Sequence, residues 1–188
     1  MFRVASIATL IAACVFAIAA GAWWFASGEP TVASNTVTPG YRIESGYRYG
    51  YTMEVPLGWE TLRSQAQEGA RAGKAGDDFV ADIAVAKEET NEPSLQVVKA
   101  QVNTFLQATD TTPAQERQVQ AGGFEGWMWE LPEQPEENPR PRRDPYRLVV
   151  LYDPRGFQWI LTFSWSSPEA LKTYESVFEH ALKTFRAK

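Results

Sequence analysis

The sequence contains a single cysteine, Cys14, and a single histidine, His180. These counts exclude a disulfide framework within the chain and a metal cluster built from its Cys and His side chains. Positive charge is also scarce, because 18 Lys and Arg stand against 23 Asp and Glu, a formal net charge of -5. Non-specific nucleic-acid binding needs a basic surface, so a nucleic-acid partner is excluded as well.

The chain also lacks the motifs of common catalytic sites. Nucleophilic catalysis by a Ser/His/Asp arrangement needs a histidine base, and His180 is the only candidate. It falls beside an amphipathic helical stripe, where a half-exposed histidine near the helix C-terminus is the commoner situation. The carboxylate pairs 77–78, 88–89 and 136–137 are typical of solvated surface charge. We therefore expect a protein that is not an enzyme and that has no cofactor and no metal site.

What is present at the N-terminus is a long run without charge. Residues 4–28 contain no charged side chain, and Val4–Ala26 is densely apolar. As a helix this run would extend roughly 34 Å at ~1.5 Å per residue, enough to cross a hydrocarbon core of ~30 Å. Arg3 precedes it, so the positive-inside rule places the N-terminus in the cytoplasm. We predict a single-pass signal-anchor in the bacterial inner (cytoplasmic) membrane, with the C-terminal domain in the periplasm.

Two alternatives remain open for this segment. A cleaved signal peptide would end in small residues, and Ala17–Ala19 and Ala20–Ala22 both fit the A-x-A pattern. Cleavage there would give a secreted protein. A lipoprotein signal is the other alternative, since Ile11–Cys14 has the residue types of a lipobox. All three hypotheses export the rest of the chain.

The part of the chain after the apolar run is predicted to be a tether followed by one domain. Small polar residues with Pro and Gly precede residue 41, so we assign 1–28 to the anchor, 29–40 to the tether and 41–188 to a single domain. Residues 61–76 lack apolar spacing and are predicted to be a mobile loop. Period-two alternation predicts strands at 47–55, 79–86, 124–131, 146–152 and 157–165, with a short polar strand at 115–120.

Two helices complete the predicted domain. Pro93 opens the first, with Asn91 or Glu92 as its cap, and an apolar stripe runs from Leu95 to Leu106. The second begins at 166–169, with Ser as cap and Glu as a possible capping-box partner. Several strands are apolar on both faces, so we expect helices to cover both sides of the sheet. The predicted fold class is α+β, an antiparallel β-sheet flanked by helices in an α/β/α sandwich, preceded by an N-terminal transmembrane helix.

Three segments in this order resemble the PsbP-like domains, a family that includes DcrB-type envelope proteins and the Mog protein. Tyr51–Trp59 resembles the opening strand and its P-x-G-W turn, and Gly123–Trp129 is similar to the middle strand. Phe157–Phe163, with the later Lys183–Phe185, is similar to the closing strand and helix. The resemblance covers about residues 45–188. It implies an antiparallel sheet between helices and a non-catalytic accessory or binding role, with no catalytic residue to transfer.

The most unusual segment is Pro132–Pro145, where five of 14 residues are Pro. Such a segment disfavours helix and sheet and is most simply a solvated hairpin loop. A stiff loop also loses little entropy when a partner captures it, and Arg140, Arg142 and Arg143 could grip carboxylates or phosphates. We take these three residues as candidate partner-binding residues. The leading hypothesis is a membrane-anchored accessory domain that binds an envelope protein. Small-ligand binding in transport or sensing is the alternative, followed by an enzyme with an unrecognised site.

Overall fold

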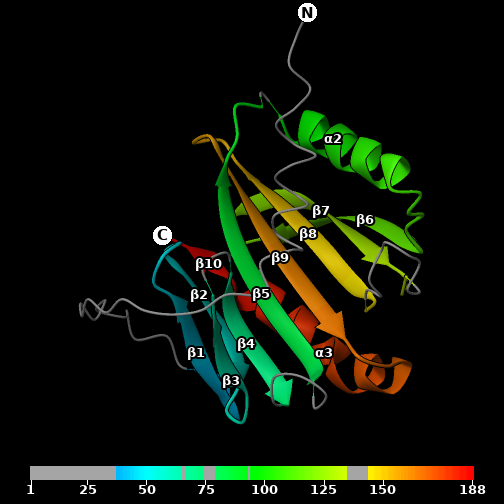
Figure 1. Ribbon diagram of the computed structural model, residues 1–188. Coiled ribbons are helices and arrows are strands. Elements are labelled where there is room, and N and C mark those ends of the chain that lie inside the picture. Colours follow the sequence, from blue (N-terminus) through cyan, green and yellow to red (C-terminus); the bar gives the residue numbers. More distant parts are fainter. Residues whose placement is uncertain (1–36, 65–66, 74–78, 93, 135–143) are drawn as a thin grey trace, which may run out of the picture.

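The computed structural model describes residues 37–64, 67–73, 79–92, 94–134 and 144–188, and for Phe79 its backbone only. The predicted anchor and most of the tether lie outside these residues. The described chain forms two helices and ten strands (Figure 1). Their bounds are β1 (Tyr41–Gly46), β2 (Tyr51–Pro56), β3 (Glu60–Arg63), β4 (Glu68–Gly73), β5 (Phe79–Glu89), α2 (Leu95–Ala108), β6 (Gln115–Ala121), β7 (Phe124–Leu131), β8 (Tyr146–Asp153), β9 (Phe157–Trp165), α3 (Pro168–Thr184) and β10 (Arg186–Ala187).

The strands form two antiparallel sheets. The large sheet has the order β3-β4-β5-β9-β8-β7-β6, so its centre is the pair β5 and β9. The small sheet has the order β1-β2-β10, which brings the last residues of the chain beside its first described strands. The fold class is therefore α+β with antiparallel sheets, as predicted, but the small sheet was not foreseen.

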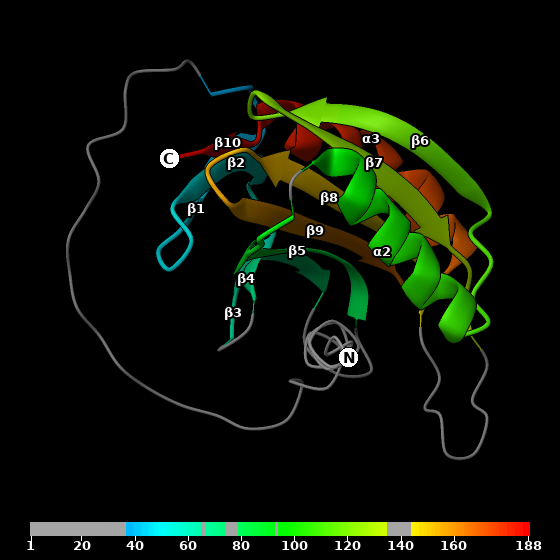
Figure 2. The ribbon, with the colours of Figure 1, turned by 90° about the horizontal axis from the view of Figure 1, so that it is seen from above.

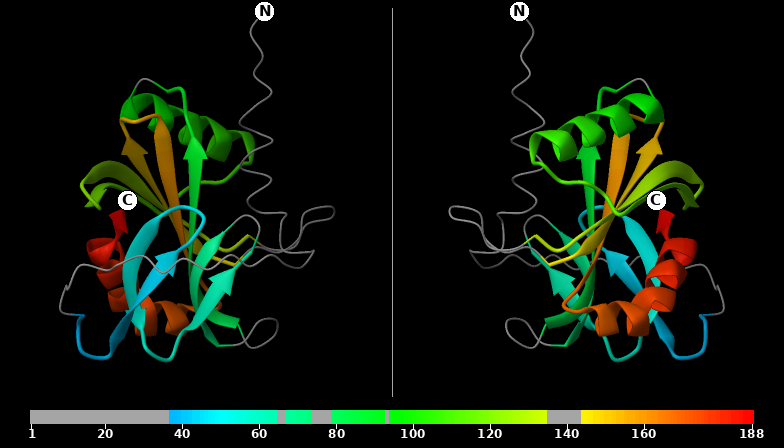
Figure 3. Two further views of the ribbon diagram at one scale, coloured as in Figure 1. Left: turned by 90° about the vertical axis from the view of Figure 1, so that its left-hand side faces the viewer. Right: turned by 90° about the vertical axis from the view of Figure 1, so that its right-hand side faces the viewer.

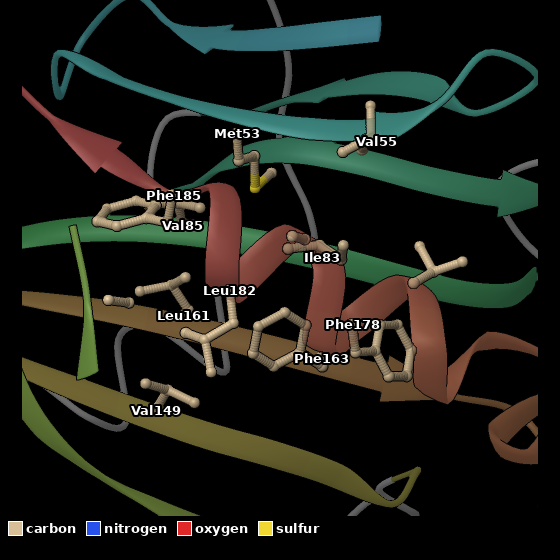
Figure 4. Close-up of a cluster of buried hydrophobic side chains, with 14 of the residues drawn as sticks. Met53, Val55, Ile83, Val85, Val149, Leu161, Phe163, Phe178, Leu182 and Phe185 are labelled. Carbon is tan, nitrogen blue, oxygen red and sulfur yellow. The ribbon is translucent and has the colours of Figure 1, made fainter. Parts of the chain in front are cut away.

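The larger core lies between the large sheet, α3 and the small sheet (Figure 4). Alternate residues of β9 are buried on this side because successive side chains of a strand point to opposite faces. Phe163 of β9 and Phe178 of α3 meet with ring centroids 5.3 Å apart. Met53 of β2 joins the same cluster, so the small sheet closes the core that the large sheet and α3 leave open.

Helix α3 begins as the sequence predicts. Ser167 is its N-cap and accepts a hydrogen bond from the N–H of Ala170, with Oγ 3.1 Å from that nitrogen. Pro168 follows at the first helical position, where its missing N–H costs nothing. The apolar face of the helix covers the core. Its buried residues are Ala170, Val177, Phe178, Ala181 and Leu182.

Helix α2 covers the other face of the large sheet, over β7 and β8 (Figures 2 and 3). Val98, Val102 and Leu106 pack there in a second, smaller core. Helices therefore lie on both faces, as predicted. The predicted cap of this helix was wrong, because Ser94 occupies the N-cap position instead of Asn91 or Glu92.

The predicted mobile loop at 61–76 was also wrong over most of its length, since the described part forms most of β3 and all of β4. Small residues are needed there for close packing. A Cβ added at Gly69 would lie 1.8 Å from the carbonyl oxygen of Ile83 on β5. The sequence pattern that suggests a loop is thus the pattern of a strand that approaches its neighbour closely.

The predicted strand at 47–55 is shorter than expected. Residues 47–50 form the turn between β1 and β2, and the strand itself starts at Tyr51. The turn after it does return Trp59 to the core, where the residue is buried. Within the described residues no helix is both long and apolar enough to span a membrane.

Candidate functional site

The two edges of the large sheet differ in length. At one edge lies β3, which has four residues. At the other lies β6, which has seven, contains no Pro and pairs with β7 without a bulge. Among the described strands β6 has a neighbour on one side only (Figure 2). An edge strand of this kind presents backbone N–H and C=O groups that can pair with another chain.

The turn after β6 determines which backbone groups face outward. Gly122 and Gly123 have φ of 60° and 87°, the left-handed conformations of a two-residue hairpin turn. The residues that flank such a turn, Ala121 and Phe124, form a directly hydrogen-bonded pair. Because hydrogen-bonded pairs alternate along an antiparallel ladder, the N–H and C=O groups of Gln120 and Gln118 point away from β7.

A groove of about 490 Å³ runs between this free edge and α3. Residues 117–123 form one wall, and Glu179, Leu182 and Lys183 form the other. Side chains of Val119 and Leu182 are buried, so the floor is apolar and closed. We call this site the edge groove. An edge strand beside a helix is the arrangement in which proteins take up an extended peptide as an added strand.

One end of the edge groove is fixed by packing on the C-terminal residues. A Cβ added at Gly122 would lie 3.0 Å from the ring of Phe185, which is fully buried. Lys183, two residues earlier, therefore lies at the end of the groove next to the Gly122–Gly123 turn. Glu179 is one helical turn away, towards Arg117.

The other end of the edge groove is an ion-pair network. The Arg117 guanidinium donates to Glu179 over 2.7 Å, and Arg147 lies 3.7 Å from the same carboxylate. Arg147 also donates to Glu130 over 2.8 Å and to Glu175 over 2.7 Å, although it is only 6% exposed. Burial acts to lower the pKa of the Arg147 guanidinium, but these bonds outweigh it and raise that pKa. Both guanidinium groups are thus engaged in ion pairs.

Lys183 differs from these two cations. Within the described part of the chain its ammonium has no hydrogen bond and no ion pair. The residues that line the edge groove carry two positive charges and one negative charge, from Arg117, Lys183 and Glu179. The groove therefore has a surplus of one positive charge on a chain whose formal net charge is -5.

His180 is half-buried, as predicted, and it holds elements together. Its Nε2 lies 2.8 Å from Oε2 of Glu54 on β2, and its ring lies 4.2 Å from that of Tyr41, centroid to centroid. The same Glu54 carboxylate accepts a bond from the N–H of Thr38 over 3.3 Å. These contacts join α3, β2 and the start of the described chain. No group of three or more His, Cys, Asp or Glu in the described ranges is arranged to hold a metal ion.

The predicted partner-binding residues Arg140, Arg142 and Arg143 lie outside the described residues. The ends of their segment are placed, because Leu131 of β7 pairs with Tyr146 of β8. The segment therefore connects two neighbouring strands, as predicted. Leu131 and Tyr146 lie at the opposite end of the meander from the Gly122–Gly123 turn. The structure thus brings Arg117, Glu179 and Lys183 together as a groove, and these residues were missed because the sequence does not show that β6 is an edge strand.

Comparison with known proteins supports the fold. No family model matches the chain, and no curated protein matches it. The solved structure of PsbP from the cyanobacterium Synechocystis sp. PCC 6803 matches with a TM-score of 0.55 and 13% identity, covering 84% of this chain and 98% of that one. PA94 from Pseudomonas aeruginosa, a protein of unknown function, matches with a TM-score of 0.50 and 13% identity, covering 77% of this chain and 94% of that one. The PsbP-like fold is confirmed, and neither structure tests the likeness to DcrB-type proteins.

Proposed function

We propose that this chain, whose fold is PsbP-like, is a non-catalytic accessory domain that holds another protein by pairing an extended segment of it with β6. The observation that carries the proposal is the free edge of β6 beside α3. Backbone groups on that edge supply affinity for any extended chain, and the groove wall supplies selectivity through alternate side chains. A binding domain needs no reacting group, which agrees with the non-catalytic accessory or binding role that the resemblance to PsbP-like domains implies.

The shape of the edge groove favours a single strand as its occupant. A strand added to β6 would lie about 5 Å from it, on the side where α3 forms the second wall. If the partner instead offered the edge strand of a folded sheet, the next strand of that sheet and a helix packed on it would also have to fit beside α3. An extended segment is narrower and meets both walls.

The proposal includes the location predicted from the sequence. An uncharged run at 4–28 after Arg3 supports an anchor in the cytoplasmic membrane, with the domain on the periplasmic side and an envelope protein as partner. Reporter fusions at residue 40 should be active only where the reporter works outside the cytoplasm. Intact mass of the mature protein tests cleavage, and a chain that starts at Trp23 would contradict the anchor.

The edge hypothesis can be tested with a matched pair of variants. Gln120→Pro removes an outward N–H and is tolerated on the free side of an edge strand, whereas Gln120→Ala removes the same side chain and keeps the N–H. A photocrosslinking residue at Gln118 in the full-length protein, irradiated in native membranes, should capture a partner in the wild type. We expect capture to persist with Gln120→Ala and to be lost with Gln120→Pro. Equal capture in both variants would contradict strand addition at β6.

A further inference from the structure

We infer that the segment taken up in the edge groove is an extended stretch of a partner protein with an acidic side chain opposite Lys183. The inference rests on the proposed function and adds the chemistry of the guest. Its basis is the pairing of the three charged side chains that line the groove. Arg117 and Glu179 bond to each other, whereas Lys183 has no partner among the described residues.

The first step concerns where guest side chains point. Side chains of a strand added to β6 alternate between the two faces of the sheet, in phase with those of β6 itself. Arg117, Val119 and Ala121 face α3, as the Arg117–Glu179 bond shows. Every second guest residue therefore enters the space between β6 and α3, and only these residues meet the helix.

The second step concerns the space available to them. Val119, Ala121 and Leu182 are each at most 7% exposed, so the floor of the groove offers little open apolar surface. A large apolar guest side chain would therefore gain little apolar contact there. Small side chains fit over the floor, and selectivity then comes from the charged rim.

The third step concerns that rim. Glu179 accepts from Arg117 over 2.7 Å, and Arg147 approaches the same carboxylate, so this end of the groove has no charge to offer a guest. Lys183 lies at the other end, beside Gly122 and Gly123, where the turn leaves open space because no atom lies within 4 Å of a Cβ added at Gly123. A carboxylate placed there gains a charge-assisted bond to the ammonium. A lysine or arginine at the same guest position would meet a like charge.

The proposal thus commits to one occupant by charge complementarity. It is an extended partner segment of mixed small residues, with Asp or Glu at the position that meets the Gly122–Gly123 end. A second copy of this chain would instead place its own β6 and α3 at the groove.

The test is a selection followed by a charge exchange. A random-peptide library displayed on phage is selected on the full-length protein in detergent micelles, and we expect binders with Asp or Glu fixed at one position. A synthetic binder and its amide counterpart, with Glu changed to Gln or Asp to Asn, are then compared by fluorescence anisotropy. The amide peptide should bind about 10-fold more weakly, the factor expected for one charge-assisted bond.

Variants of the protein test whether Lys183 causes the preference for the acidic peptide. Lys183→Met keeps the aliphatic stem and should make the acidic and amide peptides bind equally, and Lys183→Glu should favour a peptide with Lys at that position. Lys172→Met, on an exposed part of α3, is the matched control and should leave the preference unchanged.

The outcomes distinguish this inference from the proposed function. If both peptides bind alike and Gln120→Pro abolishes both, strand addition stands and the acidic guest is wrong. If Gln120→Pro affects neither peptide, the proposed function is wrong and the inference falls with it. A selection that yields no peptide, together with a dimer that Gln120→Pro dissociates, would assign the groove to a second copy and overturn the inference.

Discussion

His180 and Glu54 join α3 to the small sheet through a single short contact, with 2.8 Å between Nε2 and Oε2. The side chains are 22% and 13% exposed, so the pair is largely shielded from water. The same Glu54 carboxylate accepts a hydrogen bond from the N–H of Thr38, which lies near the start of the described residues. The only histidine of the chain thus helps to fix the place where the predicted tether meets the domain.

This contact makes the stability of the fold depend on pH in the acidic range. Burial acts to raise the pKa of Glu54, but the bonds from Thr38 and His180 outweigh it and hold that pKa below its ordinary value of 4.5. A carboxyl with a lowered pKa contributes stability that is present above its unfolded pKa and is lost as pH falls through the folded one. We expect Glu54→Gln to show a smaller loss of unfolding free energy than the wild type between pH ~7 and pH ~3, measured by urea denaturation. Glu125→Gln, exposed on β7, should behave as the wild type, and an unchanged acid response in Glu54→Gln would refute the prediction.

The two arginines near α3 should differ in what their removal costs. Arg147→Met leaves Glu130 and Glu175 without their cation, and we expect a loss of roughly 3 kcal/mol, the low end for a buried pair because Glu175 is 55% exposed. Arg117→Met breaks a pair whose members are 40% and 47% exposed, so its cost should be at most about 1 kcal/mol. Chemical denaturation of both variants checks the comparison. Equal costs would mean that the network is not shielded.

Asn103 supports the smaller core through one hydrogen bond. The indole N–H of Trp129, which is fully buried, donates to its Oδ1 over 2.9 Å. Asn103→Leu removes the acceptor of this hydrogen bond and should destabilise the protein by about 1–3 kcal/mol, the penalty of a buried unsatisfied donor. Gln107→Ala, exposed on the same helix, should change stability by no more than about 0.5 kcal/mol. Thermal unfolding of the two variants measures the difference.

Two glycines provide a test of the close approach between β4 and β5. Gly69→Ala would force a Cβ against the carbonyl oxygen of Ile83, so strands must separate, and we expect a loss of about 3 kcal/mol or more. Gly58→Ala meets no atom within 4 Å and should be close to neutral. A Gly69→Ala protein as stable as the wild type would show that β4 can shift without cost.

The Pro-rich segment keeps its own prediction from the sequence. Replacing Arg140, Arg142 and Arg143 by Ser should leave thermal stability nearly unchanged, because a solvated loop contributes little to the core. If the segment docks to a partner, recovery of that partner from solubilised membranes should fall. Recovery at the wild-type level would leave the segment as a surface loop.

Sequence periodicity predicted most of the fold because its long strands and helices bury one regular face. The alternation of apolar and polar residues in β9 and the apolar stripe of α3 are both clear in the sequence. Ser167 marks the N-cap at which the helix begins. By contrast β4 was missed because its residues are small, and smallness is required by a neighbour 14 residues away, at Ile83. Local patterns carry no information about such contacts.

The edge groove was missed for a related reason. The short polar strand at 115–120 was predicted, but a polar strand does not reveal whether its second side is paired. That property depends on the order of strands in the whole sheet. Likewise, Lys183 lacks a partner among the described residues because Arg117 already engages Glu179, and those two residues are 62 positions apart in the chain.

The central position of β5 also has a consequence for how the chain reaches its native state. Strands β6 to β9 follow one another as a meander and can zip together through local turns. The β5–β9 pair must instead close a long loop, since Gln158 and Glu88, bonded across it, are 70 residues apart. Loop closure of that length costs entropy before any contact repays it, so we expect the C-terminal meander to form early and β3 to β5 to join it in the slow step. While that step is pending, the inner side of β9 is exposed, and the partly folded chain is then most vulnerable to aggregation.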